Sequence, residues 1–579
     1  MLPLLPPVKI PFLESIPFAA RPPLLYKPAP MSKRSIGLGL GAVLVILLSA
    51  GCNKSPSTSG SAAASSNTVA RIHWLGKKKL AADRNAGRLM TIWTMIETAN
   101  LEAQTLDKLA QALAGSNQLS VISNQLSVTN YRSVLTGPAA LARALLDDVV
   151  TEESYLELRH TPAQAAELAF AIRLSEDRAR IWQTNLAALR DQKSVRSSSF
   201  SLSDLTFARA KGWTIVGSGH EKNTVAADML DRIQRTGAPF VIGASNAWLT
   251  VDMDLQRTSD ALSLGWKLPK DLPKISMQMT GDGQNVLTRG EWNFPKPLPF
   301  QIERWNIPTN IIRGSLLGFR MLQGIRPWLS SVKAWNDLHI GPPPNQLFWW
   351  SLQSHPAMTD VAAPLPDASN AVAVLSEFLL QKGTPWLKSN AFGQFLRSTI
   401  SDGVSCTTGN PLMGPFLQSV QQGRDGFVLA GLARGTATNE PLPAAVIRDF
   451  QQQTNLVYFE SEGTGAEIQT WLFVGQALRL IFWKAQLPTN SAATRWLKAT
   501  EHSLGNCTTR VTKTGPSQLT FARMSTVGFD SLELHLLGDW LESPQFPSSL
   551  HTLSAPGMVR PGAHRRTNAP PASVPGKKP

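Results

Sequence analysis

The sequence predicts an α+β fold in which largely antiparallel sheets pack against helices. Short runs rich in aromatic and β-branched residues, such as NLVYFES at 455–461 and KISMQMTG at 274–281, are typical of strands. Apolar residues three and four positions apart, as at 225–233, are typical of helices. Because strand and helix patterns do not alternate strictly, an α+β class is favoured over a doubly wound parallel sheet.

The individual elements follow from pattern and from start and stop signals. Ser175 can cap a helix, Gly237 can end one, and GDGQN at 281–285 is typical of a hairpin turn. A helix is expected after the Ser175 cap, with its apolar face at 179–189, and another is expected around 225–233 that ends at Gly237. Further helices are expected at 310–336, 367–382, 471–483, 491–504 and 531–541. Strands are expected at 154–160, 167–174, 205–209, 213–219, 247–255, 274–281, 284–292, 346–352, 426–433, 455–461, 507–513 and 518–524.

One short string, LTFAR, occurs twice, at 205–209 and 519–523, and each copy has a Trp 23 residues upstream, Trp182 and Trp496. Each copy lies in the order helix, strand, strand, helix. This recurrence predicts a duplicated unit in which Leu and Phe face a core and the Trp covers them from the preceding helix. The recurrence implies no chemistry.

The length of 579 residues predicts several domains. We expect α+β units at 69–242, 243–440 and 441–548, divided near Pro and Gly clusters. The heptad duplication SNQLSVI SNQLSVT is polar and uncharged, and it predicts an exposed insertion loop at 116–130. The basic segment 549–579 is expected to be a disordered tail.

The N-terminal region has the features of an export signal. Residues 31–52, MSKRSIGLGLGAVLVILLSAGC, combine two basic residues, an apolar segment and small residues before Cys52. The stretch resembles a bacterial lipoprotein signal, and the resemblance implies that the Cys52 thiol is acylated, although Ser49 stands where Leu is commonest. The other interpretation, an uncleaved anchor, needs more apolar residues than are present. We expect translation to start at Met31, because 1–30 is a Pro-rich leader, and 53–68 to be a flexible linker.

The charge and the cysteines limit the classes of function that the sequence allows. The net charge is +15, but two thirds of it lies in residues 1–54 and 549–579, so the body is nearly balanced and a nucleic-acid partner is not expected. Besides Cys52 the chain has Cys406 and Cys507, which would lie in a compartment that permits a disulfide; the sequence leaves their pairing open. Two cysteines without clustered His do not indicate a metal.

No catalytic motif, metal motif or cofactor motif is present in the body, so we expect no cofactor and name no catalytic residue. Trp usage is the best indication of binding. Trp349 and Trp350 would point to opposite faces of a strand, so one of them could line a cleft for a sugar or a hydrophobic ligand. Packing of both in a core is the other interpretation. The helix at 471–483 is either buried or a docking surface.

Several stretches, including GIRPWLSSVKAWNDLHIGPPPNQLFWW, TNLVYFESEGTGAEIQTW and LLGDWLESPQFP, resemble a family of uncharacterised exported proteins of Verrucomicrobia-type bacteria. The resemblance covers most of 69–548 and implies localisation and fold continuity, with no activity attached. Three functions remain open. The first is a non-catalytic binding or scaffolding lipoprotein of the cell envelope, whose partners would be the membrane and an envelope protein. The others are a carrier or receptor with a Trp-lined cleft for a hydrophobic or sugar ligand, and an enzyme of unrecognised type.

Overall fold

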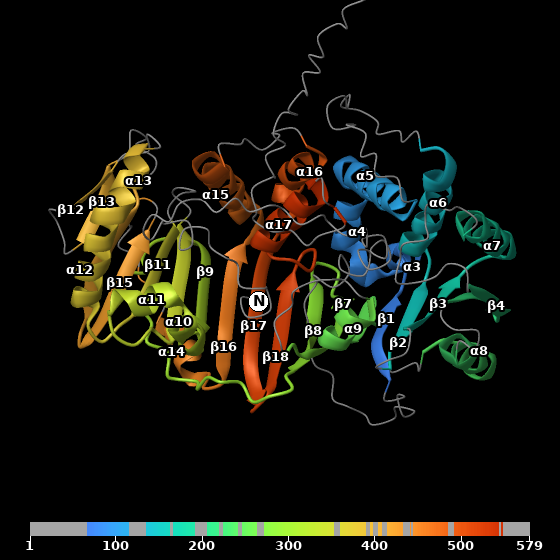
Figure 1. Ribbon diagram of the computed structural model, residues 1–579, viewed down its shortest axis with the longest axis horizontal. Helices are drawn as coiled ribbons and strands as arrows, with labels where there is room; N and C mark the ends of the chain where they lie inside the picture. The colour runs from blue at the N-terminus through green and yellow to red at the C-terminus, as the bar shows by residue number, and fades with distance from the viewer. Residues whose placement is uncertain are drawn as a thin grey trace, which may run out of the picture.

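The computed structural model contains one antiparallel sheet of 18 strands with helices on both faces (Figure 1). The predicted α+β class with antiparallel strands is therefore confirmed. The structure describes residues 67–114, 135–161, 166–190, 205–218, 224–240, 246–262, 271–352, 359–389, 394–397, 403–407, 414–431, 433, 441, 444–483, 491–543 and 546–547. The predicted leader, signal, Cys52, nearly all of the linker, the 116–130 loop and the basic tail lie outside the described residues.

The N-terminal half of the chain supplies eight strands: β1 (Thr68–Trp74), β2 (Ser154–Arg159), β3 (Glu167–Arg173), β4 (Thr206–Ala210), β5 (Trp213–Ser218), β6 (Leu249–Asp254), β7 (Lys274–Gly281) and β8 (Val286–Asn293). The C-terminal half supplies β9 (Leu316–Gln323), β10 (Gln346–Leu352), β11 (Thr359–Pro364), β12 (Gln394–Arg397), β13 (Gly403–Thr407), β14 (Phe416–Gln422), β15 (Asp425–Gly431), β16 (Leu456–Gly463), β17 (Asn506–Gly515) and β18 (Gln518–Ser525).

Strand pairing gives one linear order from edge to edge. The order is β4-β5-β3-β2-β1-β6-β7-β8-β18-β17-β16-β9-β10-β11-β15-β14-β13-β12, and every pair is antiparallel. β1 pairs with β6, so hydrogen bonds join strands on the two sides of the expected boundary at 242. β9 pairs with β16 in the same way across the expected boundary at 440.

The strand order of the first half recurs in the second half. β4-β5-β3-β2-β1-β6-β7-β8 corresponds to β14-β15-β11-β10-β9-β16-β17-β18, with β12 and β13 added at the far edge. The two orders meet at the β8–β18 pair, where Val286 lies opposite Ser525 and Asn293 lies opposite Gln518.

Helices cover the two faces of the sheet. Face A, which carries Ile72 and Leu156, is covered by α5 (Ile96–Leu113), α6 (Gly137–Thr151), α7 (Glu176–Arg190), α12 (Ala368–Phe378), α15 (Thr464–Trp483), α16 (Ala492–Thr500) and α17 (Ser531–Glu542). Face B, which carries Ile215 and Phe459, is covered by α8 (Thr224–Thr236) and α14 (Ala444–Gln452). The remaining helices are α3 (Lys77–Ala82), α4 (Gly87–Trp93), α9 (Leu255–Leu262), α10 (Arg326–Ser331), α11 (Lys333–Leu338) and α13 (Thr384–Ser389).

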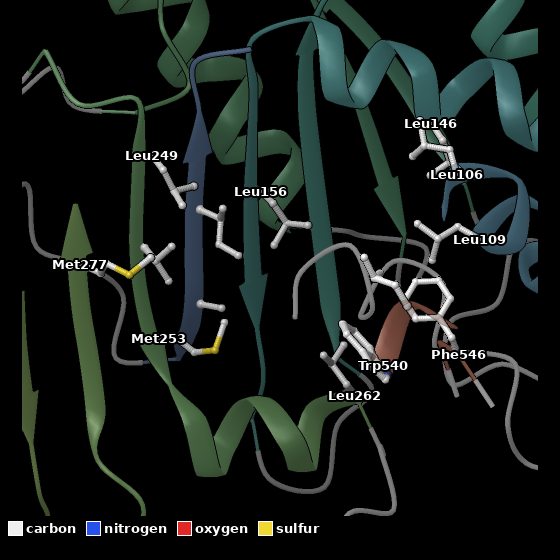
Figure 2. Packing of buried hydrophobic residues seen from close by; sticks show 14 of the residues in the cluster. Leu106, Leu109, Leu146, Leu156, Leu249, Met253, Leu262, Met277, Trp540 and Phe546 are labelled. Carbon is white, nitrogen blue, oxygen red and sulfur yellow. The ribbon is translucent and has the colours of Figure 1, made fainter. Parts of the chain in front are cut away.

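The largest apolar cluster joins the two halves of the chain. Figure 2 shows strand residues of β2, β6 and β7 together with helix residues of α5 and α6 and with Trp540 of α17, which comes from the other half. α16 lies beside α5, where Trp496 Nε1 donates to Thr98 Oγ1 at 3.1 Å. Because burial of apolar area is the main stabilising force, this shared core ties the halves into one body.

Local chemistry explains several element ends. Asp530 caps α17 in a reciprocal capping box with Glu533, and the Asp367 carboxylate accepts from Asn370 N at the start of α12. Gly237, with φ 84, ends α8 as expected. The predicted hairpin turn at 281–285 joins β7 to β8, and its Gly283 has φ 95, a conformation that favours glycine.

The expected helix at 310–336 is wrong. The structure has β9 (Leu316–Gln323) there, followed by the short helices α10 and α11. Gly314, with φ 99, precedes the strand and interrupts any helix. β9 lies in the interior of the sheet, and its last six residues are all buried, including Arg320 and Gln323. A strand buried on both faces does not alternate between buried and exposed residues, so its pattern cannot be told from that of a buried helix.

The two LTFAR strings form strands in different positions. The first lies in β4, the first strand of its hairpin and the edge of the sheet, where Phe207 is only partly buried. The second lies in β18, the second strand of its hairpin at the centre, where Leu519 and Phe521 are buried. Trp182 stacks on Phe170 of β3 at 5.9 Å, whereas Trp496 contacts α5. Both strings are strands, but their neighbours differ.

Candidate functional site

Trp349 and Trp350 point to opposite faces of β10, as strand alternation predicts. Trp350 is 1% exposed and belongs to the face B core with Phe348. Trp349 lies on face A and is only partly buried. The structure therefore separates the two residues: Trp350 packs in a core, and Trp349 retains access to solvent.

Trp349 belongs to a strip of partly exposed residues on face A. We call Leu347, Trp349, Val361, Ala363 and Tyr458 the aromatic strip; all five have intermediate exposure. Val361 lies opposite Trp349 across the β10–β11 pair, and the Tyr458 ring lies 6.3 Å from the Trp349 ring. An apolar and aromatic surface of this kind can stack on a sugar ring or contact an apolar ligand.

The strip leads directly into a row of buried polar residues. Trp349 pairs with Arg320, which pairs with Glu460, and the same row continues on face A through Thr509 to Arg523. The Arg320 guanidinium lies 6.0 Å from the Trp349 ring centroid. Trp349 is thus the member of this row where the polar interior meets the partly exposed surface.

Around this row lies a group of charged residues that we call the central cluster. It consists of two arginines and five carboxylates from β9, β16, β18, the first turns of α15 and α17, and the cap of α17: Arg320, Glu460, Glu462, Glu467, Arg523, Asp530 and Glu533. Each of the seven side chains is at most 10% exposed. Buried charges are costly unless paired, so the pairing within this cluster decides its effect on stability.

Arg320 binds three of the carboxylates. Its Nε donates to Glu460 Oε1 at 2.6 Å, its Nη2 donates to Glu462, and its Nη1 lies 3.8 Å from Glu467 Oε1. Glu462 also accepts from Ser531 N at 2.7 Å and from Ser531 Oγ at 2.6 Å. Glu462 therefore links β16 to the first residue of α17.

Arg523 binds the start of α17. Its Nη2 lies 3.1 Å from Asp530 Oδ2, its Nη1 donates to Glu533, and its Nε donates to Thr509 Oγ1 at 2.9 Å. Asp530 Oδ1 in turn accepts from Glu533 N at 2.8 Å as the helix cap. The α17 terminus is thus held to β18 by charge-assisted hydrogen bonds.

The carboxyl pKa values diverge within the cluster. Burial, together with the neighbouring Glu460 and Glu467, raises the pKa of Glu462 to about 7, although Arg320 and the hydrogen bond from Ser531 lower it. Burial and then Glu533 hold the pKa of Asp530 well above its ordinary value. Burial would also raise the pKa of Glu460, but Arg320 and Arg523 bring it below its ordinary value. Divergent pKa values are a feature of functional sites and of buried ion networks alike.

Both remaining thiols are free and buried, Cys406 in β13 and Cys507 in β17. Six strands lie between β13 and β17, which is on the order of 30 Å along the sheet. A disulfide requires Cα atoms within about 7 Å. The Cys406–Cys507 bridge that the sequence left open therefore does not form in this structure.

Within the described ranges, no group of three or more His, Cys, Asp or Glu side chains is arranged to hold a metal ion. Among the helices of the described residues, none has both the length and the apolarity to cross a bilayer.

No protein-family model, curated protein or solved structure matches this sequence. The site must therefore be interpreted from its own geometry.

Sequence reasoning found Trp349 but missed the central cluster. The pattern of β16 contains a usable signal, because Tyr458, Glu460 and Glu462 alternate with apolar neighbours and must share one face. That signal predicts a polar face, which in a strand at a sheet surface would be solvated. Only the packing of α15 and α17 over this face makes it a buried cluster, and that packing is a long-range feature.

Proposed function

We propose that the protein is a lipid-anchored, extracytoplasmic binding module that acts without catalysis and contacts its ligand through the aromatic strip. The supporting observation is the partial exposure of Trp349 beside Tyr458 on a face where helices bury most other side chains. A tryptophan left accessible in this setting contributes to affinity more than to folding. The ligand class that fits is a sugar or an apolar molecule.

The support for a lipid anchor comes from the sequence of residues 31–52. Its basic start, apolar segment and small residues before Cys52 support acylation of that thiol. Metabolic labelling with radioactive palmitate should mark the protein and place it in the membrane fraction. Cys52→Ser should lose the label, and a labelled Cys52→Ser protein would exclude this residue as the attachment site.

Ligand binding can be tested by replacing Trp349. We expect Trp349→Ala to weaken binding of a fluorescent fatty acid or of an envelope oligosaccharide at least tenfold, because stacking area is lost at the strip. Trp328→Ala is the matched control, since Trp328 is 52% exposed on α10 and is not a residue of the aromatic strip. Equal affinities of the wild type and Trp349→Ala for both probes would exclude the strip as the binding surface.

Trp350→Ala separates folding from binding. Trp350 is 1% exposed, and removing a buried Trp costs about 3–5 kcal/mol of unfolding free energy. Urea denaturation should show this loss for Trp350→Ala and a loss of less than about 1 kcal/mol for Trp349→Ala. Equal losses would favour the interpretation in which both residues pack in a core.

A scaffolding role is the second candidate. The sheet ends in two edge strands, β4 and β12, each of which pairs with one neighbouring strand among the described residues. The outer side of β12 is partly occupied, because Phe395 N donates to Thr384 Oγ1 of α13 at 3.1 Å and Phe395 O accepts from it at 3.4 Å. Exposed strand edges can accept a strand from a partner protein. Cross-linking in intact cells should capture an envelope partner through cysteines placed in β4 or β12, and failure at both edges would favour the small-ligand function.

We also propose that the chain arose by internal duplication. Only the order of elements, helix, strand, strand, helix, supports a duplicated unit around the LTFAR strings. The recurring eight-strand order supports a larger duplicated unit, with the α8 and α14 connections in equivalent places. Superposition of β1–β8 on β9–β11 and β14–β18 in an experimental structure should match their Cα traces closely, and a mismatch of strand directions would exclude it.

A further inference from the structure

The central cluster holds more negative than positive groups. Five carboxyl groups and two guanidinium groups share a region in which every side chain is at most 10% exposed. If all of these groups were ionised, the cluster would carry three surplus negative charges. A surplus of this size in a dry interior is far more costly than the binding of protons, because a buried carboxyl group neutralises instead.

The other groups that face the cluster do not balance the surplus. Tyr458 of β16, Cys507 of β17 and Ser351 of β10 are uncharged when protonated. From α17, His535 lies 3.9 Å from Asp539, so a charged His535 would first be paired by that residue. The first turns of α15 and α17 contribute about half a positive charge each at their N-terminal ends. About two negative charges remain.

The hydrogen bonds leave one carboxylate oxygen without a donor. Carboxylate oxygens accept but do not donate. Glu460, which is 1% exposed, has no hydrogen-bond partner at Oε2 among the described residues. A proton on a carboxyl group turns one acceptor into a donor, so it reduces the number of acceptors that need a partner.

We propose that the central cluster is a proton-loaded clamp: near neutral pH at least two of its carboxyl groups carry a proton, and loss of these protons in alkaline solution loosens α15 and α17 from the sheet. The clamp holds both helices at their first turns. Glu462 accepts from the backbone and hydroxyl of Ser531 at the start of α17, while Glu467 in the first turn of α15 contacts Arg320 and Ser351. When more of these groups ionise, they repel one another across the same contacts.

The direction of the carboxyl pKa values supports the clamp. The pKa values of Glu462, Asp530 and Glu533 are all raised, with burial as the largest cause. A carboxyl group with a raised pKa in the folded protein binds protons that the unfolded chain has already released. Stability is therefore greatest below the unfolded pKa, near 4, and falls as the pH rises toward the raised pKa of each group, which is about 7 for Glu462.

Amide hydrogen exchange of the full chain tests the clamp directly. After correction for the intrinsic rate, α15 and α17 should exchange at least tenfold faster at pH 9 than at pH 6, while β2 and β3 change less than twofold. Each proton that only the closed state holds makes opening about tenfold easier per pH unit. Equal protection of α15 and α17 at the two pH values would overturn the proposal.

Asp530→Asn sharpens this test, because Asn also caps helices and should preserve α17. It removes one carboxyl group that binds a proton, so the change in α17 exchange between pH 6 and 9 should fall by at least tenfold. Asp177→Asn is the control, since Asp177 is 87% exposed, and its exchange profile should match the wild type. If Asp530→Asn does not fold, Glu462→Gln provides the same comparison. An undiminished pH dependence in the folded variant would exclude titration of the cluster as the cause.

Discussion

Two groups of charged residues lie on opposite faces of the same sheet and differ in the sign of their net charge. On face B, Glu157 is fully buried with Arg159 at 3.0 Å, Arg232 at 2.9 Å and Arg71 at 3.8 Å. On face A, the central cluster has five carboxyl groups for two arginines. Both groups contain Arg–Glu pairs at similar distances, so distance alone does not distinguish them.

The net charge of each group sets the protonation state of its carboxyl groups. Burial would raise the pKa of Glu157, but Arg232, Arg71 and Arg159 together lower it. In the central cluster, burial raises the pKa of Glu462 to about 7, and Arg320, already shared among three carboxylates, does not reverse this. A buried ion pair therefore responds to the total charge around it and not to its nearest partner alone.

The largest expected effect comes from Arg320→Met, which removes the main cation of the central cluster. Glu460, Glu462 and Glu467 would lose their shared partner, and unpaired buried charge costs about 3–5 kcal/mol of unfolding free energy. Urea denaturation at pH 7 measures the loss. Arg180→Met is the control, since Arg180 is 69% exposed and should change stability by less than about 0.5 kcal/mol. A loss below about 1 kcal/mol for Arg320→Met would mean that the cluster is not coupled.

A smaller effect is expected for Glu157→Gln, which removes the carboxylate shared by Arg71, Arg159 and Arg232 and leaves Arg159 paired with Asp228. We expect a loss of about 2–3 kcal/mol at pH 7, since a hydrogen-bonded charge is lost but the amide retains part of the bonding. Because the pKa of Glu157 is lowered, the difference from the wild type should shrink as the pH falls below about 4. A difference independent of pH would show that Glu157 is neutral in the folded protein.

The smallest effect is expected for Asp360→Asn, which replaces a partly buried carboxyl group that has no ion pair among the described residues. Asp360 lies on β11, its Oδ1 has no hydrogen-bond partner among the described residues, and burial raises its pKa to about 7. A raised pKa lowers stability as the pH rises from about 4 to 7. Asp360→Asn should therefore stabilise the protein by about 1 kcal/mol at pH 8 and leave it unchanged at pH 4. Destabilisation at pH 8 would show that an ionised Asp360 is paired.

Local chemistry made much of the fold predictable. Strand alternation placed Trp349 and Trp350 on opposite faces of β10, and the turn chemistry of Gly283 located the β7–β8 hairpin. The failures concern long-range structure. β9 lacks the alternation of a surface strand because both of its faces are buried, so its pattern does not distinguish a strand from a helix, and the LTFAR strings share a sequence without sharing neighbours.

The candidate site was predictable only in part. The accessible Trp349 follows from alternation, although alternation alone did not show which of the two tryptophans is accessible. The central cluster combines residues more than 200 positions apart, from Arg320 to Glu533, and depends on β9 pairing with β16. A single sequence contains no local signal for such a pairing.

The most direct test of the proton-loaded cluster is the number of protons exchanged with solvent when the protein unfolds at pH 7. Calorimetric unfolding in buffers of different ionisation enthalpy gives this number, and the Asp360→Asn background removes the contribution of that residue. We expect unfolding to release at least two protons per chain, and the number released should be about one lower in Asp530→Asn. Zero release, or an uptake of protons, would contradict it.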